Sequence, residues 1–241
     1  MVSSRSLNPG ERQAKMNEQV ATDMIRWAGQ SDWLLEPQQD RSRRTLAKII
    51  DAAVALFCQQ GFGGTSLADI AKYSGVSIGS IYARFADKDA ILYAVIESYY
   101  RTRLTQLDNI VAMPPWKDAD LGKLIGLFIE AMFSAFQQDG DMLRVVEHRR
   151  LTDPIVAERA AKADKYVLDL FSKRMCAAVP AANRRKLRRR FSYAYYFVRN
   201  TLVLTVLLER SPFPTPLAIT NASFRQETLR FCELYLDCSH D

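Results

Sequence analysis

The sequence predicts an all-α protein that carries a helix-turn-helix, and three observations support this prediction. Residues 65–88 read as two short helices around Gly75, which can adopt the positive φ that the tight turn between them requires. Apolar residues recur at helical spacing along most of the remaining chain, with no convincing strand pattern or internal repeat. Proline-rich stretches such as residues 211–216 interrupt these segments where helices are expected to end.

The apolar spacing predicts the following elements in chain order. A helix over residues 44–60 has one apolar stripe and ends at Gly61. The helix-turn-helix comes next, and a long helix is expected from about residue 87 to about residue 111. Five further helical segments are predicted at about residues 118–138, 142–151, 153–179, 181–210 and 216–237. Residues 137–141 are expected to break the first of these from the second.

These elements group into three parts of the chain. Residues 1–40 are predicted to be a polar N-terminal extension that is partly disordered, and the alternative is an arm that docks on the protein or on DNA. Residues 41–90 are predicted to form the helix-turn-helix domain, which has three helices. Residues 91–241 are predicted to form a larger helical domain.

The segment from residue 65 to residue 88 has the residue types that a helix-turn-helix needs. Ile70, Val76 and Ile81 supply apolar contacts between the two helices, and Ser77 can cap the second one. A helix presented in this way fits the major groove of DNA. Its exposed face is expected to offer Ser77, Ile78, Gly79, Ser80, Tyr82 and Arg84.

This part of the chain, about residues 41–95, resembles the TetR (tetracycline-repressor) family of bacterial transcription regulators. The residues that carry the resemblance are Gly61-Phe62-Gly63-Gly64-Thr65-Ser66 before the motif and Tyr82-Ala83-Arg84-Phe85-Ala86-Asp87-Lys88-Asp89-Ala90-Ile91-Leu92 after it. The resemblance implies that Tyr82 and Phe85 close the recognition helix. It also implies that Lys88 opens the next helix and holds a DNA phosphate.

Positive charge around the motif supports DNA contact. Lys and Arg outnumber Asp between residues 41 and 88, and the arginines that begin the 44–60 helix oppose its dipole, so helix stability does not explain them. Arg84 stands where the family often has histidine and adds a charge near the DNA. The predicted DNA-contacting residues are Arg43, Arg44, Lys48, Thr65, Ser66, Ser77, Ile78, Gly79, Ser80, Tyr82, Arg84 and Lys88.

For the larger domain, the resemblance implies a homodimer formed through the last two helices and a pocket for a small-molecule effector. Met and aromatic residues suit such a pocket, although any helical core contains them too. The predicted ligand-contacting residues are Phe128, Met132, Phe136, Met142, His148, Tyr166, Tyr195 and Arg199. The basic run 184–190 is either a solvated face paired with acidic residues elsewhere, or a site for an anionic ligand or nucleic acid.

Composition excludes several other classes of protein. The chain has 241 residues, a formal charge of +6 and four cysteines without a Cys-x-x-Cys pair, which indicates reduced thiols and a cytoplasmic protein. Neither a secretory signal nor a membrane span is predicted. The two histidines, His148 and His240, belong to no catalytic or metal-binding motif, so no enzyme activity, cofactor or metal site is expected.

The sequence therefore predicts a sequence-specific transcription regulator. Its partners would be a palindromic operator in double-stranded DNA, a second copy of the chain and a small-molecule ligand that releases a repressor from the operator. The alternative is a ligand-binding or protein-interaction module that keeps the regulator scaffold without binding DNA.

Overall fold

The computed structural model describes residues 40–209 and 218–236, with side chains from residue 44 onward. The predicted N-terminal extension before Asp40 therefore lies outside the described residues. Within the described ranges the elements are all helical, as the sequence predicts. They are α2 (Asp40–Gln60), α3 (Leu67–Ser74), α4 (Ile78–Tyr82), α5 (Lys88–Ala112), α6 (Leu121–Arg150), α7 (Pro154–Ala177), the 3₁₀ turn η1 (Ala181–Asn183), α8 (Arg184–Leu208) and α9 (Ala222–Leu236).

Two compact units make up the structure, and the division between them falls between Thr102 and Arg103, inside α5. A domain boundary at residue 90 stays a prediction. No helix in the described ranges is long and apolar enough to cross a membrane.

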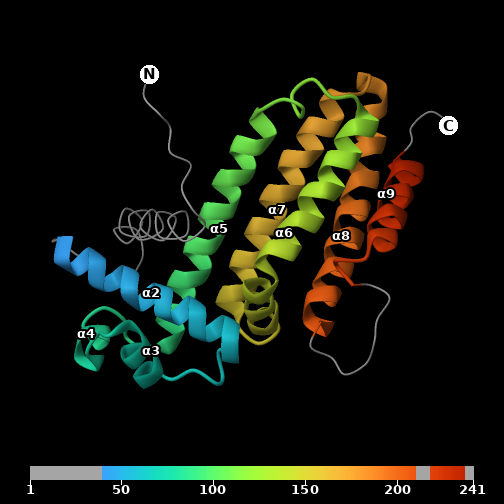
Figure 1. Ribbon diagram of the computed structural model, residues 1–241. Helices are drawn as coiled ribbons and strands as arrows, with labels where there is room; N and C mark the ends of the chain where they lie inside the picture. Colours follow the sequence, from blue (N-terminus) through green and yellow to red (C-terminus); the bar gives the residue numbers. More distant parts are fainter. Residues whose placement is uncertain (1–39, 210–217, 237–241) are drawn as a thin grey trace, which may run out of the picture. The chain divides into compact units, whose positions relative to one another are not determined.

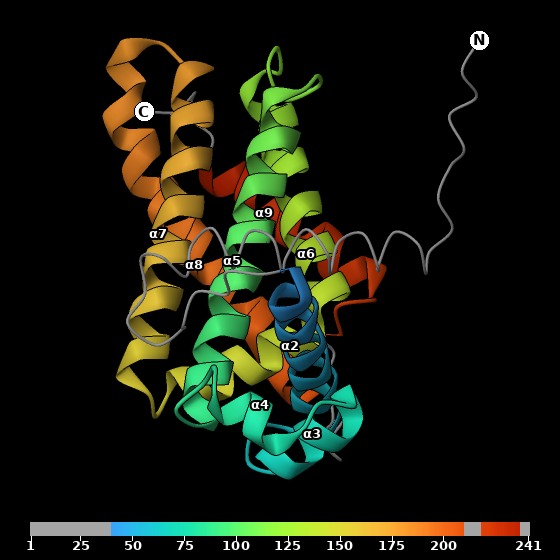
Figure 2. The same ribbon diagram turned by 90° about the vertical axis from the view of Figure 1, so that its left-hand side faces the viewer.

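The first unit contains the helix-turn-helix and the helices that support it. In Figures 1 and 2, α3 packs against α2 and α4 packs against α3. The predicted apolar stripe of α2 is buried, as are Ile70 of α3, Ile81 of α4 and Phe85 just after it. Helix α4 has five residues, fewer than an isolated helix needs for stability in water, so this core must hold it in place.

Lys88, the first residue of α5, ties that helix to the loop between α2 and α3. Its ammonium donates hydrogen bonds to the carbonyl oxygens of Phe62 (2.7 Å) and Thr65 (2.6 Å). The same nitrogen lies 4.2 Å from the centre of the Phe62 ring, a cation–π distance. The first turn of α5 is capped by Asp87, whose carboxylate accepts the Ala90 amide at 2.7 Å. These contacts fix the chain on both sides of the helix-turn-helix.

The second unit is a helical bundle in which α6, α7 and α8 run side by side, with α9 against α6 and α8 (Figure 1). Its core centres on Phe128, whose ring lies 5.0 Å from that of Phe171 and 5.2 Å from that of Phe191. Both contacts are edge-to-face, which is a favourable arrangement of aromatic quadrupoles.

The predicted break at residues 137–141 is wrong, because α6 runs without interruption from Leu121 to Arg150. Asp139 is buried and forms an ion pair with Arg103 of α5, and Met142 is buried one turn later. At Gly140, an added Cβ would lie 4.0 Å from Val206 of α8, so this residue sits close to the neighbouring helix. Tertiary contacts therefore outweigh the low helix propensity of a lone glycine.

We predict that Lys88→Ala destabilises the protein by about 2 kcal/mol, because it removes two charge-assisted hydrogen bonds to backbone carbonyls. Lys72→Ala, at an exposed lysine of α3, is the matched control and should change stability by less than about 0.5 kcal/mol. Urea denaturation measures both. Equal unfolding midpoints for the two variants would show that the Lys88 contacts do not support the fold.

Candidate DNA-binding surface

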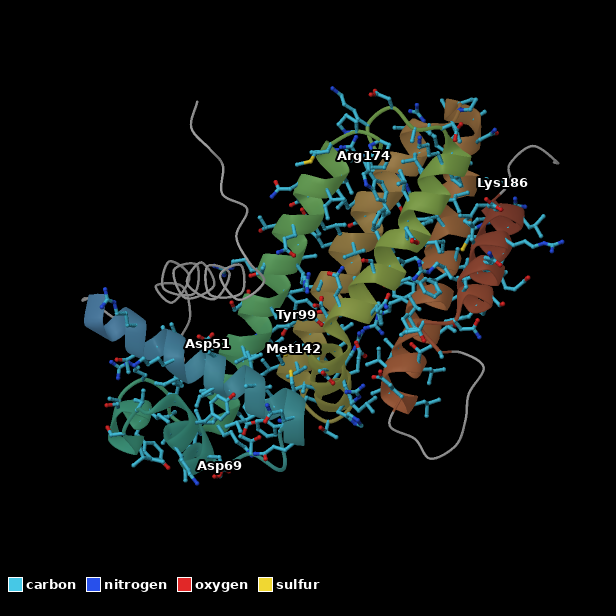
Figure 3. All side chains as sticks on the ribbon, viewed as in Figure 1. Asp51, Asp69, Tyr99, Met142, Arg174 and Lys186 are labelled. Carbon is cyan, nitrogen blue, oxygen red and sulfur yellow. The ribbon has the colours of Figure 1, made fainter. Side chains whose placement is uncertain are left out.

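The two helices of the motif begin and end through local interactions that the sequence encodes. Ser66 and Asp69 form a capping box at the start of α3 (Asp69 is labelled in Figure 3). The Ser66 amide donates to the Asp69 carboxylate at 2.9 Å, and the Asp69 amide donates to the Ser66 hydroxyl at 3.1 Å. Hydrogen bonds from the Ser66 hydroxyl and then from its amide lower the pKa of Asp69, so this carboxylate stays ionised. Gly75 ends α3 with φ of +66°, as predicted.

Ser77 caps α4, as predicted, and its hydroxyl accepts the Ser80 amide at 3.2 Å. The two hydroxyls also lie 2.9 Å apart and share a hydrogen bond. Arg84 turns back on the same helix, because its guanidinium donates to the Ser80 carbonyl at 2.7 Å. Ser77, Ser80 and Arg84 therefore use much of their hydrogen-bonding capacity inside the motif.

Large side chains of α3 and α4 point to solvent. Ile78 is 42% exposed, Tyr82 is 58% exposed and Tyr73 is 57% exposed. Sequence reasoning missed Tyr73, and the signal for it was an aromatic residue outside the buried spacing of α3. These three side chains therefore lie outside the core of the motif and are accessible to a partner.

Gly79 lies in helix α4, and the fold does not require a glycine at this position. A Cβ built on it would meet no described atom within 4 Å, and its φ is not positive. Glycine inside a helix costs about 0.5–1 kcal/mol relative to alanine. The described fold therefore does not explain why this position is glycine.

The remaining predicted DNA contacts are placed as follows. Arg44 and Lys48 are exposed on α2, while the side chain of Arg43 lies outside the described residues. Thr65 is 2% exposed and its hydroxyl donates to the Gly61 carbonyl at 2.9 Å, so we leave its side chain out of the candidate surface. Lys88 uses two of its three N–H donors internally, which leaves one for a phosphate.

The eight predicted ligand-contacting residues lie in different surroundings, and their contact with a ligand stays a prediction. The structure places Phe128, Met132, Phe136, Met142 and Tyr195 in the core of the second unit. His148 is exposed at the end of α6, and the exposed Tyr166 donates its hydroxyl to Asp108 at 2.7 Å. This hydrogen bond raises the pKa of Tyr166.

Arg199 is buried in an ion cluster of the second unit. Its Nε donates to Asp164 at 2.9 Å and its Nη2 donates to Glu147, while Arg150 also pairs with Asp164 at 2.8 Å. Burial pulls the pKa of Arg199 down, but the charges of Asp164 and Glu147 outweigh it and raise the pKa above its usual value. The guanidinium thus serves the packing of α6, α7 and α8. Across the described ranges, no group of three or more His, Cys, Asp and Glu residues could hold a metal ion.

Comparisons with known proteins match the same part of the chain. The family model described as "Bacterial regulatory proteins, tetR family" matches residues 49–95. The uncharacterized HTH-type transcriptional regulator YerO of Bacillus subtilis is 32% identical over 114 residues, which cover 46% of this chain and 36% of YerO. The HTH-type transcriptional regulator TtgR of Pseudomonas putida is 38% identical over 64 residues, which cover 27% of this chain and 30% of TtgR. The chain thus spans only about a third of the length of these relatives.

Solved structures share the fold over most of the chain. GusR of Salmonella enterica superimposes with a TM-score of 0.57 at 19% identity, covering 80% of this chain and 96% of GusR. FadR of Bacillus subtilis, in complex with stearoyl-CoA, has a TM-score of 0.57 at 18% identity, covering 80% of this chain and 98% of FadR. These solved structures show the fold, and residues 49–95 match the helix-turn-helix domain of the tetR family of bacterial regulatory proteins.

Proposed function

We propose that this protein is a sequence-specific DNA-binding transcription regulator that works in the cytoplasm as a homodimer. The observation that carries the proposal is the outer face of α4, where Ile78, Gly79 and Tyr82 have no role in the described core. A face with one bulky apolar group, one aromatic group and one gap for close approach suits base edges in the major groove. Arg44 and Lys48 add positive charge on α2 for the phosphates.

The contacts divide into two kinds. Ile78, Gly79 and the exposed part of Tyr82 would read sequence or lie against the bases. Arg44, Lys48 and the third donor of Lys88 would neutralise phosphates and fix the register without reading sequence. Ser66, Ser77, Ser80 and Arg84 would act mainly by shaping the motif, with their remaining donors close to the DNA backbone.

The homodimer is supported by an exposed apolar face on α8 and α9. Phe197 and Phe231 are both exposed although their rings lie 4.8 Å apart, and Phe231 stacks on Tyr235 at 5.6 Å. Leu204 is half exposed, and Leu234 is 71% exposed on α9. A second copy related by a twofold axis would cover this face. The same axis would present two recognition helices to a palindromic operator.

We propose that a small molecule controls DNA binding and releases a repressor from its operator. Two neighbours of this fold bind different ligands: FadR of Bacillus subtilis binds stearoyl-CoA, and a regulator of Saccharomonospora viridis binds choline. In this chain the ligand would have to enter between the helices that enclose Phe128 and Tyr195, since these side chains are buried. We propose no catalytic role for the chain.

The test of DNA reading is selection of an operator from random duplex DNA, followed by Gly79→Ala. We expect the variant to be as stable as the wild type or up to about 1 kcal/mol more stable, because alanine favours a helix and has room there. Its affinity for the selected operator should fall by about 1–3 kcal/mol, as for a lost base contact. Gly126→Ala in α6, where space is also open, is the control and should bind normally. Equal affinity of the two variants for the operator would remove Gly79 from the reading surface. Failure to enrich any sequence would favour the module without DNA binding.

The test of phosphate contact is the salt dependence of operator binding. Arg44→Gln and Lys48→Gln should each reduce the slope of log affinity against log salt concentration by about 0.9. They should weaken binding to all sequences alike. Fluorescence anisotropy at several salt concentrations measures the slope, with the exposed Lys123→Gln as a control of equal charge change. Unchanged slopes in both α2 variants would remove α2 from the interface.

The dimer is tested by Leu204→Glu and Leu234→Glu, which place a charge in the exposed apolar face. We expect monomers or insoluble protein, because burying an unpaired carboxylate costs more than the contact provides. Gln226→Glu adds the same charge at an exposed polar position of α9 and should remain dimeric. Sedimentation velocity at micromolar concentration distinguishes the forms. A monomeric wild type would contradict the dimer and the palindromic operator together.

A further inference from the structure

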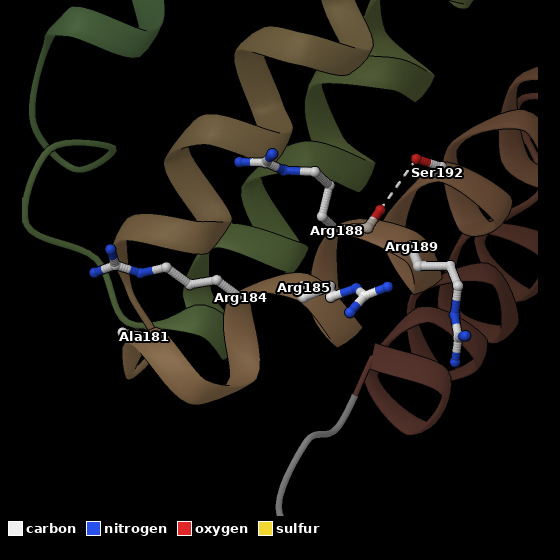
Figure 4. Close-up of a pocket in the computed structure, with 6 residues that line it drawn as sticks. All are labelled: Ala181, Arg184, Arg185, Arg188, Arg189 and Ser192. Atoms are coloured by element: carbon white, nitrogen blue, oxygen red, sulfur yellow. Dashed lines mark hydrogen bonds between the residues drawn. The ribbon is translucent and has the colours of Figure 1, made fainter.

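The basic run at the start of α8 lines a pocket of the second unit. Ala181 of η1 and Arg184, Arg185, Arg188, Arg189 and Ser192 of α8 surround an open hollow of about 420 Å³, here named the arginine pocket. Figure 4 shows its arginines extending in different directions from the helix, with the Ser192 hydroxyl bonded to the Arg188 carbonyl at 3.0 Å. The volume lies within the range of small-molecule sites, about 300–1,000 Å³.

The structure offers little internal compensation for this charge. Within residues 40–209 and 218–236, Arg185, Arg188 and Arg189 form no ion pair with a carboxylate. Arg184 donates only a 3.4 Å bond from Nε to the Val179 carbonyl among the described contacts. Other arginines of the same unit are paired with acids, namely Arg103, Arg144, Arg149, Arg150, Arg199 and Arg225. The interpretation of the basic run as a face paired with acidic residues therefore lacks support for these three side chains.

The helix itself adds to the positive potential. No described side chain caps the start of α8 at Asn183, and the first turn contains no acidic residue. The amide groups of the first turn carry partial positive charge, which disfavours arginine and favours an anion. An anion at this place would offset both the mutual repulsion of the arginines and the dipole of α8.

The chemistry of the lining points to phosphate groups. Arginine presents a planar fork that binds phosphate oxygens in pairs, and it is more weakly hydrated than lysine. Four arginines line one hollow, and their exposed guanidinium groups would have to turn toward it to meet several negative charges on one compact molecule. From residue 184 to residue 192 the helix rises about 12 Å, which is short for an extended nucleic-acid track.

We propose that the arginine pocket binds a compact polyanion with two or more linked phosphate groups, of the class of nucleoside di- and triphosphates and inorganic oligophosphates. The site is separate from the core residues considered for the effector, and it does not depend on DNA binding by the helix-turn-helix. Ligand bound there would stabilise the folded protein by an amount that grows with the logarithm of the ligand concentration above Kd.

The experiment titrates the full chain with inorganic tripolyphosphate, ATP and orthophosphate by isothermal titration calorimetry. We expect one tripolyphosphate per chain, bound at least about tenfold more tightly than orthophosphate. Arg185→Gln/Arg188→Gln/Arg189→Gln should weaken tripolyphosphate at least about tenfold, because charge-assisted hydrogen bonds are lost. Its melting temperature without ligand should equal or exceed that of the wild type, since no described ion pair is removed. ATP binding more tightly than tripolyphosphate would assign the nucleotide as the source of the phosphates, and the reverse order would assign the inorganic chain.

Two further variants separate a built site from general positive charge. Lys123→Gln/Lys173→Gln/Arg230→Gln removes the same charge at exposed positions of the second unit and should bind tripolyphosphate as the wild type does. Arg185→Lys/Arg188→Lys/Arg189→Lys keeps the charge but not the fork, and its affinity should lie between those of the wild type and the Gln variant.

Several results would overturn the proposal. These are absence of tripolyphosphate and ATP binding to the wild type, equal losses in the Gln variant and the Lys123 control, and full binding by the Gln variant. Single-stranded DNA or anionic vesicles that bind through the same arginines, undisplaced by tripolyphosphate, would instead assign the surface to a macromolecular or membrane partner.

Discussion

The candidate DNA-binding surface depends on the burial of one short helix against its neighbours. Helix α4 has five residues, too few to nucleate and persist in water, so its geometry comes from its surroundings. Ile81 and Phe85 bury one side, Ser77 fixes the first turn, and Lys88 holds the chain beyond it to the loop before α3. Each of these contacts lies on the inner side or at an end of the helix, so the residues of its outer face are not needed to hold the helix in place.

Because the inner face and the ends of α4 hold it in place, the side chains of its outer face are the ones available to a partner. Ser77, Ser80 and Arg84 bond within the motif, so their orientation is fixed before any DNA arrives. Ile78 and Tyr82 expose apolar area to water, which lowers the stability of the folded protein. Gly79 also lowers it, because a glycine in a helix loses more backbone entropy on folding than an alanine would. The inner contacts hold this surface in one conformation before binding. Association with a partner then costs less conformational entropy, so the surface is preorganised for binding.

Local signals made much of the first unit predictable from sequence, and long-range contacts set the limit. The turn at Gly75 and the cap at Ser77 depend on residues within a few positions, and the apolar spacing of α2 identified its buried side. The Lys88 ammonium instead meets carbonyls 26 and 23 residues earlier in the chain, which no spacing rule shows. The continuity of α6 through Gly140 likewise depends on Arg103 and Val206, whose proximity only the packed helices establish.

In the second unit, burial also fixes where the charged side chains lie. Glu147 and Asp164 lie against Arg199 between α6, α7 and α8, where separating them would leave a desolvated charge without a partner. Acids held in this way cannot move to the surface to neutralise the start of α8. The excess of positive charge therefore stays where the chain places it, on exposed arginines at a helix start that has no side-chain cap. Such a region gains stability from an external anion more readily than from any rearrangement of the described core, which is why its charge is better explained by binding than by folding.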